Sequence, residues 1–360
     1  MNFLNPDRRR FLRFSLAGAA SASAAGLLGR AGAAQAQKKV QAQASATGSA
    51  GAYPVIVLNS RDADLSLIDP KSHQVIGRIP TGKEPHHLYP TPDNRLVVVG
   101  NAMSDSLTFL DPATGTVMHA VSGVDDPYHL GFSPDQNFFV TCANRLDHVD
   151  VYRRVGHGDE MKLQGLARFN LAKTPSHLVF SDDSRVVYVT LQESHELVAI
   201  DLRRLVVLWR FAVGNLPAGV AISPDSKLIF VGVMGENAID VIQVSGRNRS
   251  DPQRVTKIVT GEGAHAFRNQ GNRQHLWVSN RVANSLSKVD MGSLKVEAEI
   301  KVPGGPDCMD IHESGKQLWV TQRWIRAVSV VDLDAGKVIK RITVGRSPHG
   351  VYLHDRAGLL

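Results

Sequence analysis

Along most of the chain, short apolar stretches alternate with polar turns at the spacing of β-strands. Two of them, Ser106–Leu110 and Ala327–Val331, alternate apolar and polar residues as half-buried strands do. Turns such as Ser133–Asn137 carry Pro at the second position and Asp at the third, which favours a tight reversal between antiparallel strands. The pattern therefore predicts an all-β protein built from short antiparallel strands.

One phrase recurs seven times along the chain: a loop containing Gly or Pro, a short apolar strand and a polar turn. The copies begin at Pro85, Pro127, Pro175, Pro217, Gly263, Pro306 and Pro348, which lie 42 to 48 residues apart. This period is typical of a four-stranded propeller blade with its turns. Insertions at Arg153–Gly165 and Ser245–Arg254 account for the longer spacings.

The repeat is offset at the two ends of the chain. The first strand, Val55–Leu58, matches the second strand of a unit, whereas the last strand, His349–His354, matches the first. Pairing of these strands would complete one blade and close the ring without an exposed sheet edge. We therefore predict a seven-bladed β-propeller over residues 52–354, followed by a C-terminal tail at 355–360.

The units resemble the YVTN-type (YncE-like) β-propeller repeat family. In that repeat, one apolar strand ends in Asn, the next ends in Asp, and Thr-Gly follows. The residues that carry the resemblance are Phe138, Val140, Asn144, Asp111, Thr114, Gly115, Asp332, Ala335 and Gly336. The resemblance covers about residues 52–354. It implies the propeller architecture but no particular chemistry, because the same repeat serves many tasks.

Residues 1–36 have the features of an export signal. The segment Asp7–Arg13 resembles the twin-arginine motif, and a weakly apolar stretch, Phe14–Gly29, follows it. Ala34–Ala36 has the small residues of a cleavage site. We expect cleavage near Ala36 and a periplasmic mature protein without a membrane anchor. Residues 37–51 are expected to form a flexible leader.

The formal net charge of +7 is concentrated in this signal, which carries five arginines against one acid, Asp7. The rest of the chain is close to balanced and has no cluster of Lys and Arg that could neutralise a row of phosphates. The charge pattern therefore argues against nucleic acid as a partner.

Cys142 and Cys308 are the two cysteines of the chain. They fall in blades three steps apart around a seven-membered ring, which is too far for a disulfide. Both thiols should therefore be free. No Cys-x-x-Cys-His segment occurs, which excludes a c-type haem.

The loop that enters the innermost strand of each blade is unusually rich in histidine. It should lie, together with the turn between the second and third strands, at one end of the central channel, which we call the mouth. Six of the 14 histidines fall in these seven four-residue windows: His86, His87, His129, His177, His265 and His349. Cys308 occupies the histidine position of its own repeat.

The turn between the second and third strands adds polar groups to the mouth. Its arginines are Arg61, Arg145, Arg281 and Arg323. They are either solvated rim charges or donors for a carboxylate or phosphate on a ligand. The amides that end the second strands, such as Asn59 and Asn101, are expected to satisfy turn backbone.

Three interpretations of the histidines remain open. In the first, they hydrogen-bond neighbouring blades and stabilise the ring. In the second, they ligate a metal or a haem, because neutral imidazole is a common ligand. The candidate ligands are His87, His129, His177, His265, His349 and Cys308. In the third, they perform acid–base chemistry on a small substrate.

Two further resemblances bear on the second interpretation. The mouth is similar to the d1-haem propeller of periplasmic nitrite reductases, and the His86-His87 pair is similar to one in the copper-cluster propeller of nitrous oxide reductases. The chain lacks the eighth blade and c-haem domain of the former. It also lacks the cupredoxin domain and the seven ligand histidines of the latter. The resemblances thus imply copper or a d1-type haem in a smaller relative or an assembly factor.

We therefore expect a periplasmic propeller that binds a small-molecule ligand, cofactor, metal or anion at its mouth. It would support a redox or cofactor-handling pathway, together with a periplasmic redox partner protein. One alternative is a hydrolase that resembles propeller lactonases. The other is a non-catalytic interaction scaffold, a common use of propellers.

Overall fold

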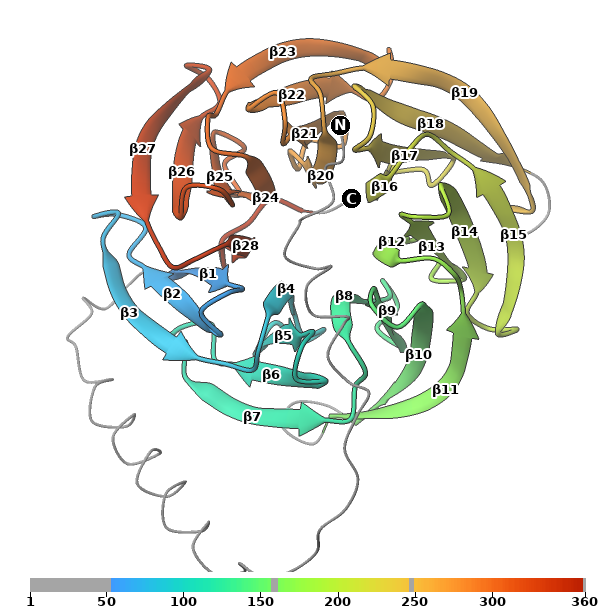
Figure 1. The fold of residues 1–360 in the computed structure, drawn as a ribbon, viewed down its shortest axis with the longest axis horizontal. Helices are drawn as coiled ribbons and strands as arrows, with labels where there is room; N and C mark the ends of the chain where they lie inside the picture. The colour runs from blue at the N-terminus through green and yellow to red at the C-terminus, as the bar shows by residue number, and fades with distance from the viewer. Residues whose placement is uncertain (1–52, 157–160, 246–248, 359–360) are drawn as a thin grey trace, which may run out of the picture. The chain divides into compact units, whose positions relative to one another are not determined.

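The computed structural model describes residues 53–156, 161–245 and 249–358. The predicted export signal at 1–36 and leader at 37–51 lie outside these residues. Seven sheets of four antiparallel strands are arranged in a ring around a central channel (Figure 1). The predicted all-β, seven-bladed propeller is confirmed. Within the described residues, no helix has the length and apolar character needed to cross a membrane.

Each blade contributes one strand to each of four concentric positions. The innermost strands are β4 (Pro85–Pro90), β8 (Pro127–Phe132), β12 (Pro175–Phe180), β16 (Pro217–Ile222), β20 (Ala264–Asn269), β24 (Pro306–Ile311) and β28 (Pro348–Tyr352). The second strands are β1 (Val55–Asn59), β5 (Val97–Asn101), β9 (Phe138–Ala143), β13 (Val186–Leu191), β17 (Leu228–Val233), β21 (His275–Asn280) and β25 (Gln317–Gln322).

The two outer positions complete the blades. The third strands are β2 (Asp64–Ile68), β6 (Ser106–Leu110), β10 (His148–Val155), β14 (Glu196–Asp201), β18 (Ala238–Ser245), β22 (Ser285–Asp290) and β26 (Ala327–Asp332). The outermost strands are β3 (Val75–Pro80), β7 (Val117–Ser122), β11 (Lys162–Asn170), β15 (Val206–Ala212), β19 (Asp251–Val259), β23 (Lys295–Lys301) and β27 (Lys337–Thr343).

The ring closes between the two ends of the chain, as predicted. Strand β28 pairs antiparallel with β1, and Val351 lies opposite Val57. Both predicted insertions lengthen outer hairpins: β10 with β11, and β18 with β19, are the longest hairpins of the ring.

The hydrophobic core lies between the faces of neighbouring blades. Second strands such as β1 are buried along their whole length, whereas outermost strands such as β3 alternate between exposed and partly buried residues. Trp319, which is fully buried, packs in one cluster with Val57 and Val351 of the adjoining blade. Apolar burial of this kind supplies most of the stability of the ring.

The amide groups of Asn59 and Asn101 bind hydroxyls of the adjacent third strand, whereas the prediction was that they satisfy turn backbone. The Asn59 amide donates to the Ser66 hydroxyl, and the Asn101 amide donates to the Thr108 hydroxyl. The two cysteines, Cys142 and Cys308, are free and buried, which confirms the prediction that they do not pair.

The segment that follows β28 is held against the end of the channel opposite the mouth. The buried Arg268 donates from Nε to Asp310 Oδ1 at 2.7 Å and from Nη2 to the Ala357 carbonyl at 2.5 Å. The other oxygen of Asp310 accepts from the Leu353 amide. An unpaired charge at this depth would be costly, so this ion pair anchors residues 353–357 to the ring.

Candidate functional site

A β-bulge in every innermost strand gives the channel its lining. In β4, Pro85 lies opposite Asn101 and Leu88 lies opposite Val99, so that two residues, His86 and His87, oppose the single residue Gly100. Such a two-for-one bulge breaks the alternation of side chains between the two faces of a strand. Consecutive side chains of the strand therefore both reach the channel.

The bulges arrange the lining in two tiers. The first tier holds the residue that follows the start of each inner strand, and the second tier holds the next one. The first tier is His86, Tyr128, Ser176, Ala218, His265, Asp307 and His349. The second tier is His87, His129, His177, Gly219, Ala266, Cys308 and Gly350.

This register corrects one detail of the predicted repeat. The fifth copy of the repeat begins at Ala264 and not at the predicted Gly263, because Ala264 is the first residue of β20 and pairs with Asn280. His265 consequently lies in the first tier beside Asp307, and the second tier of this blade carries Ala266.

All six predicted histidines come together, but they lie inside the channel rather than in loops at its mouth. Their exposed fractions range from 0% for His86 and His349 to 6% for His87. They belong to the innermost strands themselves. The difference arises because the two residues after the first residue of each innermost strand form a bulge within the strand, and not a loop before it.

Three second-tier histidines from consecutive blades form a compact group. The ring centroids of His87 and His129 lie 4.3 Å apart, those of His129 and His177 lie 4.9 Å apart, and those of His87 and His177 lie 5.1 Å apart. One nitrogen from each ring lies within 4.8 Å of the others. Because tetrahedral coordination at 2.0–2.1 Å places ligand nitrogens about 3.4 Å apart, small ring rotations would bring them onto one ion.

Neighbouring groups leave one nitrogen of each of these rings unoccupied. Tyr89 Oη lies 3.2 Å from His129 Nε2, and Ser176 Oγ lies 2.9 Å from His177 Nδ1. The remaining atoms, His129 Nδ1, His177 Nε2 and His87 Nε2, are buried without a hydrogen-bond partner. Buried polar atoms are normally satisfied, whereas each ring of this compact group has one nitrogen without a hydrogen-bond partner.

His349 has its tautomer fixed by the backbone. Its Nδ1 lies 2.8 Å from the His86 carbonyl, which can only accept, so Nδ1 carries the proton. The Nε2 lone pair then points into the channel, where that atom has no hydrogen-bond partner. A hydrogen bond to the non-ligating nitrogen is the usual way in which metal-binding histidines are oriented.

The channel holds its histidines in the neutral form. Burial lowers the pKa of His129 to about 3, and it lowers those of His87 and His177 well below the usual value, with help from the neighbouring imidazoles. Neutral imidazole is the form that ligates a metal.

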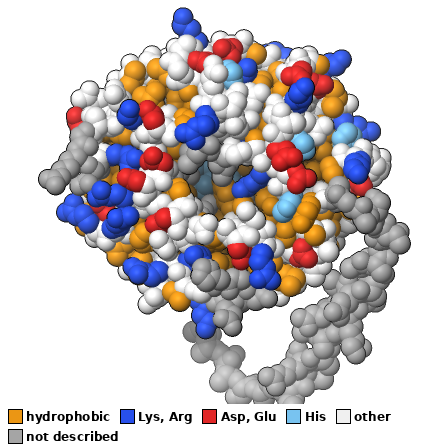
Figure 2. Space-filling view, turned by 180° about the vertical axis from the view of Figure 1, so that it is seen from behind, with side chains coloured by type: hydrophobic (Ala, Val, Ile, Leu, Met, Phe, Trp, Pro, Cys, Tyr) orange, Lys and Arg blue, Asp and Glu red, His pale blue; other side chains and the backbone are white. Residues whose placement is uncertain are grey.

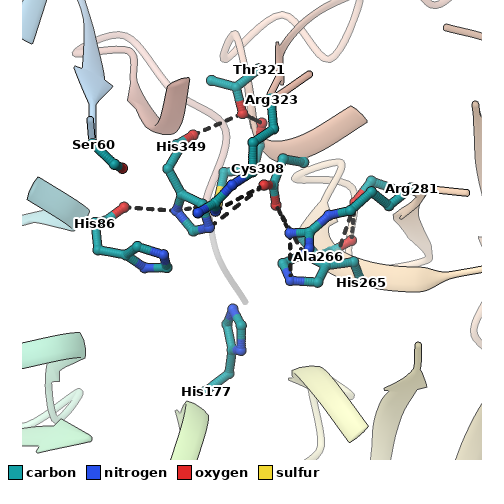
Figure 3. A network of polar contacts seen from close by, with 12 residues as sticks. Ser60, His86, His177, His265, Ala266, Arg281, Cys308, Thr321, Arg323 and His349 are labelled. Atoms are coloured by element: carbon teal, nitrogen blue, oxygen red, sulfur yellow. Dashed lines mark hydrogen bonds and ion pairs between the residues drawn. The ribbon is translucent and has the colours of Figure 1, made fainter. Parts of the chain in front are cut away.

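The buried Asp307 holds together the other half of the first tier through His265, Arg281, Arg323 and His349, which Figure 3 labels. Its Oδ1 accepts from Arg281 Nη2 at 2.7 Å and lies 3.0 Å from His265 Nδ1. Its Oδ2 lies 3.5 Å from Arg323 Nη1. Although burial raises the pKa of this carboxyl, Arg281 and the two adjacent histidines hold it well below its usual range. Asp307 is therefore ionised.

His265 is already occupied by this network. Arg281 Nη2 lies 2.8 Å from His265 Nε2, and since a guanidinium can only donate, Nε2 must accept. The other nitrogen faces Asp307. The structure therefore brings His265 to the cluster but leaves it without a free lone pair for a metal.

Cys308 lies at the edge of the cluster. Its Sγ is 3.4 Å from His349 Nδ1, and Asp307, Cys308 and His349 together form a second group whose ligand atoms lie within 4.8 Å of one another. Burial and the Asp307 charge raise the pKa of the Cys308 thiol well above its usual value. The thiol is protonated, so it would need a metal to lose its proton.

Of the four predicted arginines, two lie at the cluster and two do not. Arg281 and Arg323 converge on Asp307. Arg61 is exposed, and the Arg145 side chain binds Asp126 and the Ala102 carbonyl. Arg61 and Arg145 are therefore rim residues, in line with the interpretation of these arginines as rim charges rather than as donors to a ligand.

Sequence reasoning missed three contributors. Asp307 is not among the predicted site residues, although it has the same first-tier register as His86 and His349. Ser176 has the same register, which was available in the repeat. Tyr89 is reached only through the fold, since it lies two residues beyond His87 and contacts a histidine of the next blade.

The site fits a metal ion and does not fit a d1-type haem. Rings two blades apart have centroids only 5.1 Å apart for His87 and His177 and 6.4 Å apart for His265 and His349. His86 is sandwiched between Tyr128 and His349, with centroids 3.8 and 3.6 Å away. A flat macrocycle would have to occupy space that these side chains fill.

The molecule is thus a seven-bladed propeller with a buried, histidine-lined channel. The model of the YNCE-like β-propeller family matches residues 14–359, and the chain belongs to this family. No protein of curated function matches the sequence.

Solved structures share the fold at low identity. A functionally unknown protein from Desulfotomaculum acetoxidans is 14% identical, with a TM-score of 0.72 over 84% of this chain and 98% of that one. The periplasmic gluconolactonase PpgL of Pseudomonas aeruginosa is 16% identical, with a TM-score of 0.71 over 86% and 100%. The dihydro-heme d1 dehydrogenase NirN is 15% identical, with a TM-score of 0.63 over 86% and 77%. At these identities the likeness concerns the fold alone.

Proposed function

We propose that this protein binds a transition-metal ion, copper by the chemistry of the ligands, through His87, His129 and His177. The observation that carries the proposal is a compact group of three buried histidines from consecutive blades, each with one nitrogen that has no hydrogen-bond partner. Imidazole suits copper and zinc, and copper(II) binds more tightly than any other divalent ion of the first transition row. Cys308 adds a soft thiol in the same tier of the channel, which also favours copper.

The chain's own residues would perform four tasks in such a site. Three imidazoles would supply neutral donors, while Tyr89 and Ser176 orient two of them. The fully buried lining would exclude water. His349 would keep an unprotonated Nε2 beside the site, 3.6 Å from Asp307 Oδ2. When bound, the metal would supply Lewis-acid or one-electron chemistry.

The setting of the proposed function is the periplasm. The support is the export signal inferred for residues 1–36, with cleavage near Ala36. Cysteines held apart in the fold are also compatible with an oxidising compartment. On the face shown in Figure 2, acidic and basic side chains are interspersed, which supports a small ligand or a periplasmic redox protein as partner rather than nucleic acid.

The lactonase alternative has less support from the site. A lactone needs an open pocket with an accessible acid–base group, whereas the six histidines are at most 6% exposed. The shared fold with PpgL does not carry its activity to this chain.

The proposal is tested by loading the mature protein, purified from a periplasmic extract, with copper(I) or zinc(II) and measuring bound metal by elemental analysis. We expect one tightly bound ion per chain at the histidine triad. The double variant His129→Gln/His177→Gln should lose at least 100-fold in affinity, measured by competition with a chelator. His119→Gln, on outer strand β7, is the matched control and should bind as the wild type does. A wild-type protein that binds neither metal would overturn the proposal.

A further inference from the structure

Two arginines enter the channel from the turns that follow β21 and β25, on the side of the first tier. Arg281 and Arg323 have side chains 17% and 18% exposed, and both reach the fully buried Asp307. Because each side chain is partly exposed and also contacts Asp307, these arginines lie between solvent and the buried cluster at this end of the channel.

The charges of this network do not balance. Two guanidinium groups face one carboxylate, and the adjacent histidines do not add a negative charge to compensate. His349 donates from Nδ1 to the His86 carbonyl and has no hydrogen-bond partner at Nε2, and His265 Nε2 accepts from Arg281, so neither ring carries a second proton. One positive charge is therefore left over in a region of low dielectric, where an unpaired charge is costly.

The arginines also have unused hydrogen-bond donors. Arg281 spends Nη2 on Asp307 and His265, whereas its Nε is buried without a partner. The Arg323 guanidinium makes a single ion pair at 3.5 Å and no side-chain hydrogen bond to any described residue. A guanidinium carries five donors in a planar fork, so most of the donors of Arg323 are available.

We propose that Arg323 and Arg281 bind a small planar oxyanion, a carboxylate or a nitrogen oxyanion, at the mouth of the channel beside Asp307 and His349. The oxyanion would supply the missing negative charge. Its two oxygens would match the fork of Arg323, a geometry that a spherical anion cannot satisfy. Asp307, Cys308 and His349 are buried, so the anion would lie on their solvent side, within reach of the two guanidinium groups.

This site stands on its own residues and does not require the metal. If the proposed metal site is also correct, the two ligands should help each other, because a cation in the second tier adds positive charge beneath the anion. Thermodynamic linkage then requires the anion to strengthen metal binding by the same factor.

The test is isothermal titration of sodium formate and sodium nitrite into the mature protein, in metal-free and metal-loaded forms. We expect both anions to bind the metal-free protein at least tenfold more tightly than chloride does. Tighter binding of formate would identify a carboxylate ligand, and tighter binding of nitrite a nitrogen oxyanion. Either order supports the site.

The matched variants are Arg323→Gln and Arg326→Gln, which remove the same charge from the same turn, although only Arg323 reaches Asp307. Arg323→Gln should weaken anion binding at least tenfold, and Arg326→Gln should leave it unchanged. Arg323→Lys keeps the charge without the fork and should fall between them. Thermal unfolding checks that each variant is folded.

Equal effects of Arg323→Gln and Arg326→Gln, no anion binding by the wild type, or chloride binding as tightly as formate would each overturn the inference. The two proposals fail separately. Anion binding without metal binding overturns only the metal site, whereas metal binding without anion binding overturns only the oxyanion site.

Discussion

At the scale of single residues, the state of each histidine depends on its neighbour rather than on the ring itself. His349 is fixed by a backbone carbonyl and His265 by Arg281 and Asp307. His129 relies on the phenol of Tyr89. The six histidines are therefore not equivalent, although they look alike in the sequence.

Tyr89 gives a direct test of this dependence. Tyr89→Phe removes the partner of His129 Nε2 while preserving the ring volume, and we expect metal affinity to fall by about tenfold, as is usual when the partner of a ligating histidine is lost. Competition titration measures the change. Tyr152→Phe, whose hydroxyl contacts Asp150 away from the channel, should leave the affinity unaltered. Equal affinities for both variants would show that Tyr89 does not orient His129.

At the scale of the strands, the blades could be predicted from the sequence, whereas the bulges could not. Strand positions and closure could be predicted because side-chain alternation and turn residues repeat seven times. The bulge could not, since it follows from backbone pairing between adjacent strands, as for His86 and His87 opposite Gly100. For the same reason His265 was assigned to the right cluster but to the wrong register.

Gly219 shows why the run of second-tier histidines, His87, His129 and His177, does not continue into the next blade. It occupies the second-tier position of β16, but a Cβ there would overlap the carbonyl oxygen of His265 on the neighbouring strand. Because backbone on both sides limits relaxation, we expect Gly219→Ala to lower the free energy of unfolding by about 1–3 kcal/mol, measured by urea titration. Gly165→Ala, where a Cβ meets nothing within 4 Å, is the control. A Gly219→Ala protein as stable as this control would contradict the close approach of β16 and β20.

At the scale of the whole molecule, the buried histidines couple stability to pH. The folded-state pKa is about 3 for His129 and about 4 for His265, and it is lowered for His87, His177 and His349. Between these values and the usual value near 6.5, the unfolded chain takes up protons that the folded ring does not. The stability they provide is thus present above about pH 6.5 and is lost as the pH falls towards the folded-state values.

We expect the metal-free protein to lose about 1.4 kcal/mol per pH unit for each such histidine below pH 6. Because the pKa values of five histidines are lowered, the loss for the whole cluster should exceed that for one histidine and should destabilise the domain at mildly acidic pH. Urea titrations between pH 7 and 5 measure the slope. His129→Gln should reduce it by about one histidine's share, and His119→Gln should not. A stability that is independent of pH over this range would mean that the cluster is not neutral.

The central claim is that the second tier of the channel holds a metal ion, and crystallography at the metal absorption edge tests it most directly. In crystals of copper-loaded protein, we expect one anomalous peak about 2.0–2.1 Å from His87 Nε2, His129 Nδ1 and His177 Nε2. A copper peak confined to surface histidines, with the triad nitrogens still unpartnered, would contradict the account.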